Sequence, residues 1–144
     1  MERIFISRVI HADVDAVWAV IRDFNGLADW HPAIADSTIE HGRPADAVGC
    51  VRSFHLVDGG HIREQLTELS DAHRRMRYII LDSPMPVTGY DASVELLPVT
   101  ENGTSLVVWK AEFEVGPDDA KSTVQTVADG VFRAGLAALA ERLE

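Results

Sequence analysis

The chain has 144 residues, 47% of them hydrophobic, and its 23 acidic and 13 basic side chains give a formal net charge of −10. This length is typical of one domain, and a domain of this size buries roughly 70% of the surface that its unfolded chain exposes. A surface this negative repels phosphate backbones, which argues against a nucleic-acid partner. No apolar run is long enough for a membrane span, and the N-terminus lacks the charged-then-apolar order of a signal peptide. We therefore expect a single cytoplasmic domain, residues 1–144, that is a monomer or a homodimer.

The first third of the chain predicts a strand and two helices. Residues 3–11 predict a strand, and Asp13 suits the N-cap of a helix that ends near Asp23. Residues 24–34, FNGLADWHPAI, are interrupted by Gly26 and Pro32, so they predict a short, broken second helix. Its apolar side chains are expected to close one end of the sheet, with His31 capping the turn.

Six runs rich in β-branched and aromatic residues follow, bounded by Gly, Asp, Asn and Pro. They predict strands at 36–42, 48–56, 61–69, 74–81, 90–97 and 105–115. Because no crossover helices separate these strands, the sheet should be antiparallel. The loop at 82–89, with two prolines, is expected to form a rim or gate at the mouth of a cavity.

The last part of the chain predicts one long helix. Gly116 and Pro117 end the final strand, and Asp118 or Asp119 is expected to cap a helix that runs almost to Glu144. Such a helix is about 39 Å long, enough to cross a small sheet. Its expected apolar stripe is Val124, Val127, Val131 and Ala138, widened by Phe132, Leu136, Leu139 and Leu143. Gly130 and Gly135 inside this helix permit a bend or the close approach of a ligand or strand, or they have no structural role.

Strand parity predicts which side chains face the core. In the last strand and its neighbour, apolar and polar residues alternate, so one set faces inward and the other faces water. The inward sets are Tyr90, Ala92, Val94, Leu96, Val107, Trp109, Ala111 and Phe113. Parity shows no apolar patch on the outer strand faces.

The hairpin before them places charge on the inner face. If Phe54 faces inward, Cys50 and Arg52 share its face, and Glu64 lies inward on the facing strand. A three-residue turn with a positive φ at Gly60 makes Arg52 and Glu64 diagonal neighbours, with residue 54 opposite 64. A two-residue turn instead places Arg52 opposite Gln65.

Two interpretations of this inward Arg and Glu remain open. One is a structural ion pair, since buried charges are costly unless they are paired. The other is a polar anchor in an apolar cavity, which is the usual composition of small-molecule sites, with Tyr78 and Tyr90 adding hydroxyl groups. Pairing with Arg52 is expected to lower the pKa of Glu64 and weaken it as a base.

Motifs for metal, thiol or serine chemistry are missing. The one cysteine, Cys50, allows no internal disulfide, and a lone inward cysteine is usually a small hydrophobe. The six histidines form no H-x-H or HExxH pair, so we expect no metal site. The sequence also contains no G-x-S-x-G elbow and no glycine-rich phosphate loop before a helix.

The element order, together with particular residues, resembles the polyketide cyclase/dehydrase group of the START-like, Bet v 1-like helix-grip superfamily (SRPBCC). The residues that carry the resemblance are Val17 and Trp18, Phe24 to Pro32, Gly49 to Arg52, Glu64 to Leu66, and Trp109. The resemblance covers nearly the whole chain. It implies an α+β helix-grip fold, in which a curved antiparallel sheet of about seven strands wraps around the long C-terminal helix, with two short helices after strand 1.

The resemblance also implies a function and a site. It suggests a small hydrophobic or aromatic carbonyl-bearing ligand, and cyclase, dehydratase or isomerase chemistry without a cofactor. The plant lachrymatory-factor synthases, which resemble this group, use an Arg, a Glu and a Tyr for proton transfer, and these match Arg52, Glu64 and Tyr90. The residues expected to contact the ligand are Trp30, Phe54, Leu66, Tyr78, Trp109, Phe113 and Val131, although the aromatic ones also suit a plain core. The alternatives are a non-catalytic carrier or sensor of a lipid-like or polyketide ligand, and a protein-interaction domain.

Overall fold

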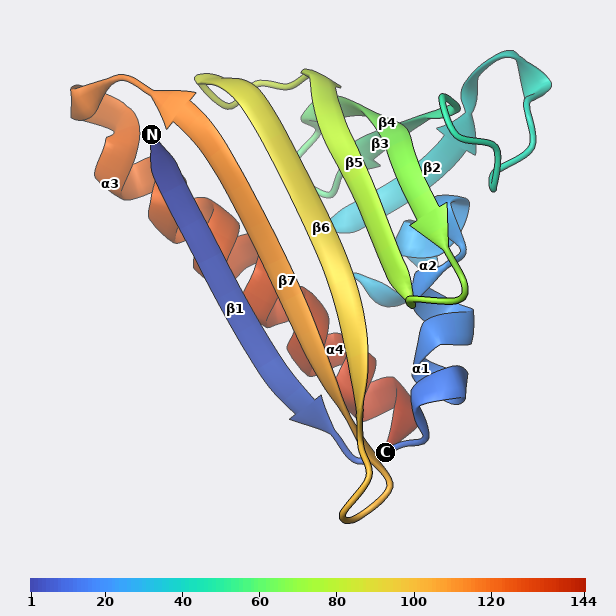
Figure 1. The fold of residues 1–144 in the computed structure, drawn as a ribbon. Coiled ribbons are helices and arrows are strands. Elements are labelled where there is room, and N and C mark those ends of the chain that lie inside the picture. The colour runs from blue at the N-terminus through green and yellow to red at the C-terminus, as the bar shows by residue number, and fades with distance from the viewer.

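Seven antiparallel strands form one curved sheet in the order β1-β7-β6-β5-β4-β3-β2 (Figure 1). The computed structural model describes residues 1–144. The strands are β1 (Glu2–Ile10), β2 (Ile34–Ile39), β3 (Val51–Leu56), β4 (His61–Ser70), β5 (Arg75–Asp82), β6 (Val87–Val99) and β7 (Thr104–Val115). The antiparallel sheet predicted from the strand spacing is confirmed.

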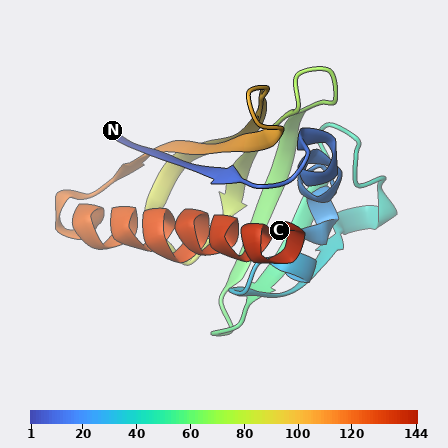
Figure 2. The same cartoon turned by 90° about the horizontal axis from the view of Figure 1, so that it is seen from below.

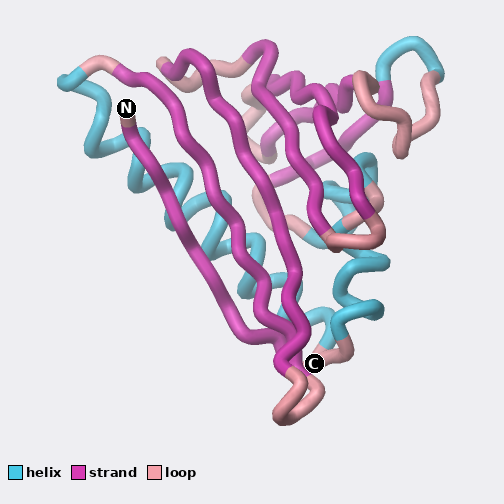
Figure 3. The backbone as a smooth tube through the Cα atoms, in the orientation of Figure 1, coloured by secondary structure: helices cyan, strands magenta, loops and turns pink.

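Two short helices follow β1 and close one end of the sheet (Figure 3). Helix α1 (Val14–Ile21) has the predicted N-cap, since the Asp13 carboxylate accepts a hydrogen bond from the Asp15 N–H at 3.1 Å. A 3₁₀ turn (Phe24–Gly26) leads into α2 (Leu27–Trp30), and a second 3₁₀ turn (Glu40–Gly42) follows β2. The broken second helix predicted for residues 24–34 is confirmed.

One long C-terminal helix lies along one face of the sheet (Figure 2). It consists of α3 (Pro117–Gln125), a π-helical segment (Thr126–Arg133) and α4 (Ala134–Leu143). The predicted cap at Asp118 or Asp119 was wrong, because Gly116 is the N-cap and Pro117 takes the first helical position. Proline suits that position because its φ is already helical and its missing N–H needs no partner.

The π-helical segment also changes which face of the long helix is buried. Buried residues step from Val127 to Phe132, a spacing of five, and continue at Leu136 and Leu139. A π turn inserts one extra residue into the helical repeat. The face that the following residues present to the sheet is therefore shifted by one residue position. The expected stripe was therefore wrong only in part. Ala138 lies outside the core cluster, whereas Val131 is half-buried and packs against the core, as Val124 and Leu143 do.

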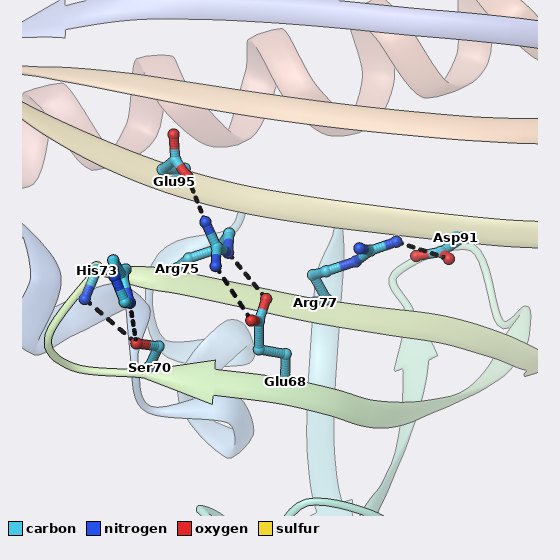
Figure 4. Close-up of polar contacts among 7 residues, drawn as sticks. All are labelled: Glu68, Ser70, His73, Arg75, Arg77, Asp91 and Glu95. Carbon is cyan, nitrogen blue, oxygen red and sulfur yellow. Dashed lines mark hydrogen bonds and ion pairs between the residues drawn. The ribbon is translucent and has the colours of Figure 1, made fainter.

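The inner face of the sheet carries the core that parity predicts. All eight inward residues of β6 and β7 are buried. The outer face of β4 to β6 carries ion pairs, with Arg75 bridging Glu68 and Glu95 at 2.9 and 3.1 Å (Figure 4). The outer face is not free of apolar residues, however. Val9 faces Leu106, which faces Leu97, and Phe5 is 63% exposed, so the expectation of no outer apolar patch was wrong.

The β3–β4 register differs from both predicted alternatives. Arg52 lies directly opposite Glu64, and Phe54 lies opposite Ile62. The connecting loop has four residues, 57–60, and the glycine with positive φ is Gly59 (+95°) and not Gly60. The observed pairing differs from the preferred one by two positions, so every side chain keeps its predicted face.

Candidate ligand-binding site

A buried ion pair lies on the inner sheet face, between β3 and β4. Arg52 on β3 and Glu64 on β4 are 2% and 6% exposed, and their facing positions bring the two side chains together. The Arg52 Nε and Nη2 atoms donate to Glu64 Oε1 at 2.9 and 2.7 Å, and Nη1 donates to the Phe24 carbonyl oxygen at 2.8 Å. All three guanidinium nitrogens therefore hold protein oxygens.

Aromatic rings surround the Arg52 guanidinium. Its Cζ lies 4.0 Å from the centroid of Phe24 and 4.8 Å from that of Tyr78, with Phe54 at 5.7 Å. Rings in this position attract a cation through their negative faces. Both the hydrogen bonds and the ring contacts hold Arg52 in one place.

Glu64 keeps one oxygen free of this pairing. Both hydrogen bonds from Arg52 end on Oε1, and Oε2 accepts none. Burial raises the pKa of Glu64, and the nearby Arg52 charge offsets only part of that rise. The expectation that pairing lowers this pKa was therefore wrong, because removal from water outweighs the ion pair.

A small cavity lies beside Arg52, between the sheet and α4. Its volume is about 10 Å³, roughly the space of one water molecule. Of the predicted site residues, it is lined by Trp30, Arg52, Tyr78 and Trp109. The remaining lining residues, which the sequence did not single out as a site, are Ile21, Asp23, Leu27, Met76, Val94 and Leu136.

Two indole N–H groups near this cavity differ in their partners. Trp109 Nε1 donates to the Tyr78 hydroxyl oxygen at 3.0 Å. Trp30 Nε1 is buried and has no hydrogen-bond partner. Burial raises the pKa of Tyr78, so its hydroxyl keeps its proton.

The other predicted site residues, which include Glu64 and Val131, lie outside the cavity lining. Tyr90 stacks on Phe113 with ring centroids 5.5 Å apart. Phe54 packs in a smaller apolar cluster with Leu27, and Leu66 is fully buried in the main core. Of the predicted aromatic contacts Phe54, Trp109 and Phe113, only Trp109 lines the cavity.

His31 joins the end of α2 to the long helix. Its Nδ1 accepts from the Ala33 N–H at 3.1 Å, so Nε2 carries the proton that it donates to the Val131 carbonyl oxygen at 2.8 Å. That carbonyl belongs to the π-helical segment. Both ring nitrogens are satisfied only in the neutral form, and burial lowers the pKa of His31. His31 therefore does more than cap its own turn.

Acidification is expected to weaken the fold through His31. Because the pKa of His31 is lowered in the folded chain, the unfolded chain takes up this proton first as the pH falls below about 6.5. The contribution of neutral His31 is fully present above that pH and is lost as the pH falls toward the folded pKa. We expect the free energy of unfolding, measured by urea titration from about pH 7.5 to about pH 5, to fall more steeply for wild type than for His31→Gln.

The matched control for this prediction is His11→Gln, which removes an exposed imidazole. Glutamine at position 31 retains an amide N–H for the Val131 oxygen, so the variant tests the charge and not only the contact. An identical pH slope for wild type and His31→Gln would contradict the proposed effect of burial.

No group of three or more His, Cys, Asp or Glu side chains is arranged to hold a metal ion. None of the helices combines the length and the hydropathy that a bilayer-spanning segment needs.

Comparisons with solved structures find close relatives of this fold. The protein XoxI from Bacillus cereus is 32% identical, with a TM-score of 0.86, and the match covers 99% of this chain and 96% of that one. A protein from Thermobifida fusca is also 32% identical, with a TM-score of 0.89 and coverage of 99% and 93%. Norcoclaurine synthase from Thalictrum flavum is 18% identical, with a TM-score of 0.77 and coverage of 99% and 93%, which shows a shared fold alone.

No curated protein matches the sequence. A family model, in contrast, matches every residue of the chain. The model of the family described as "Polyketide cyclase / dehydrase and lipid transport" matches residues 1–144. Together with the seven-stranded sheet that grips a long helix, this match shows that the chain belongs to the polyketide cyclase/dehydrase and lipid transport family of the SRPBCC, or START-like, superfamily.

Proposed function

We propose that this chain binds a small hydrophobic or aromatic molecule bearing a carbonyl group, between the sheet and the long helix. The observation that carries the proposal is the buried Arg52–Glu64 pair, of which Arg52 lines a cavity whose other lining residues are apolar or aromatic except for Asp23. A few placed polar groups in an apolar enclosure are typical of small-molecule sites. The family description, which combines cyclases, dehydrases and lipid transport, supports the same class of ligand.

Ligand binding requires the cavity walls to move apart. The cavity holds about 10 Å³, whereas drug-sized ligands occupy pockets of roughly 300–1,000 Å³. The short α2 helix and α4 each contribute to the lining, through Trp30 and Leu136. A separation of these two helices from the sheet would enlarge the space without breaking the strand pairing.

Within this proposal, Glu64 moves a proton. Its raised pKa brings the carboxyl closer to the neutral range, where a group serves best as both acid and base. Glu64 does not line the closed cavity, so its carboxyl would reach the ligand only after the walls have moved apart. The free Oε2 would then take a proton from the carbon next to the ligand carbonyl and return it to another atom, which is the step shared by cyclisation, dehydration and isomerisation. Arg52 holds Oε1 and so orients the carboxyl.

A second candidate is a carrier that binds the same ligand without changing it. It is favoured by the hydrogen bonds of Arg52, because each guanidinium nitrogen already holds Glu64 or Phe24 and only one N–H on each Nη atom is left for a ligand. In a carrier the pair would only orient the polar end of the ligand.

Mass spectrometry on a ligand library separates the two candidates. Poly-β-ketones, aromatic metabolites and fatty acids are each incubated with wild type, Glu64→Gln and the control Glu68→Gln, which removes a charge from the outer face of the same strand. We expect wild type and Glu68→Gln to convert a carbonyl compound and Glu64→Gln to lose about 10²-fold or more of that rate. Binding without conversion in all three proteins would establish the carrier, and no binding of any compound would exclude both.

A further inference from the structure

We infer that the Trp30 indole N–H and the Tyr78 hydroxyl hold the oxygen of the ligand, so that the site selects an uncharged carbonyl over a carboxylate. The inference rests on the proposed function, and it names the atoms that recognise the ligand and the chemical class that they accept. In this inference Tyr78 takes the role that the sequence assigned to Tyr90, because Tyr90 stacks on Phe113 outside the cavity lining.

The first donor is left without a partner by the fold itself. Trp30 is the last residue of the one-turn helix α2 and lines the cavity, with its ring centroid 6.2 Å from that of Trp109. Its Nε1 atom is buried and unpaired, although an indole N–H can only donate. An unmet buried donor is costly, so we expect the Trp30 N–H to have a partner that the protein itself does not supply.

The second donor is the proton of Tyr78. The Tyr78 oxygen accepts from Trp109 Nε1, so the hydroxyl is oriented, and it donates to no protein atom. Tyr78 comes from β5 and Trp30 from α2, and both line the same small space. A carbonyl oxygen has two lone pairs and can accept from both groups at once.

Charge at the cavity opposes an anionic ligand. Arg52 is the one cation in the lining, and the Glu64 carboxylate already neutralises it at 2.7 Å. Asp23, exposed at the rim of the same cavity, adds a further negative charge. A carboxylate placed here would be a buried charge without a counter-ion, which is strongly unfavourable.

Three probes on one carbon skeleton test this selection: indan-1-one, indane and indane-1-carboxylate. Their affinities are measured by isothermal titration calorimetry on the full chain, for wild type, Trp30→Phe, Tyr78→Phe and the control Trp18→Phe. Trp18 donates its indole N–H to Asp71, away from the cavity, so this control removes an indole without removing a proposed donor. We expect wild type to bind the ketone about tenfold more tightly than the hydrocarbon, and the carboxylate least tightly.

Each outcome has a definite meaning. The inference is supported if the ratio of ketone affinity to hydrocarbon affinity falls to near one in Trp30→Phe and Tyr78→Phe. The same ratio should keep its wild-type value in Trp18→Phe. Equal affinity of wild type for ketone and hydrocarbon overturns it and leaves the proposed binding function intact. Tightest binding of the carboxylate also overturns it and would point to Arg52 as the anchor. Failure of all three probes to bind would overturn the proposed function and this inference together.

Discussion

Replacing Arg52 with methionine is expected to lower the free energy of unfolding by about 3–5 kcal/mol. Arg52 is 2% exposed and donates three hydrogen bonds, two of them to Glu64 and one to the Phe24 carbonyl oxygen. Methionine fills a similar length but leaves the buried carboxyl without its cation. The loss is measured as the shift in urea midpoint at constant slope.

The double variant Arg52→Met, Glu64→Leu should recover a large part of that loss. Removing both charges removes the cost of an unpaired buried carboxyl, and apolar replacements of buried ion pairs are often neutral or better. One cost remains, because the Phe24 carbonyl oxygen still lacks its donor. Arg63→Met, which removes the half-exposed arginine paired with Glu40, is the matched control and should change stability little.

These variants also address why the pair is present. A double variant that is as stable as wild type, yet no longer binds ligand, would show that Arg52 and Glu64 serve the site and not the fold. A double variant that stays as unstable as the single one would contradict the ion-pair account of Arg52. In that case the aromatic contacts and the Phe24 hydrogen bond would carry the stability.

Much of the fold could be predicted from the alternation of apolar and polar residues along the strands. The register between β3 and β4 could not. The inward sets on β6 and β7 follow from a period of two, and all of them are buried. Between β3 and β4 a shift by two residues leaves every side chain on the same face, so the apolar pattern cannot choose. The choice is made by the four-residue loop, where Gly59 has φ +95° and the Leu56 N–H donates to the Gly60 oxygen at 2.8 Å.

The candidate site could be predicted only in part. Arg52 and Glu64 stand out because charged residues at inward positions are rare. The cavity lining instead combines residues of α1, α2, the sheet and α4, and Trp109 in that lining is covered by Phe132 of the π-helical segment, with ring centroids 4.5 Å apart. No residue pattern in that helix announced the extra residue in its turn. The unpaired Trp30 N–H was equally hidden, since whether a donor finds a partner depends on three-dimensional neighbours.

The same substitution at two glycines of the long helix is expected to have opposite effects. On helix propensity alone, replacing either Gly130 or Gly135 with alanine should raise the free energy of unfolding by roughly 0.5–1 kcal/mol. At Gly130 an added Cβ meets nothing within 4 Å, so Gly130→Ala should stabilise the fold by about that amount. At Gly135 the added Cβ would lie 2.7 Å from His31 Cδ2 and 2.8 Å from Trp109 Cζ3.

Neither neighbour of Gly135 can move cheaply. Both ring nitrogens of His31 are hydrogen-bonded, and Trp109 is fixed by Tyr78 and by its stacking on Phe132. Overpacking of this kind costs about 1–3 kcal/mol, which exceeds the gain in propensity, so Gly135→Ala should destabilise. Urea titration of the two variants side by side measures both signs. If both variants were more stable than wild type, the helix would not lie this close to His31 and Trp109 in solution, and the cavity beside them would be wider than about 10 Å³.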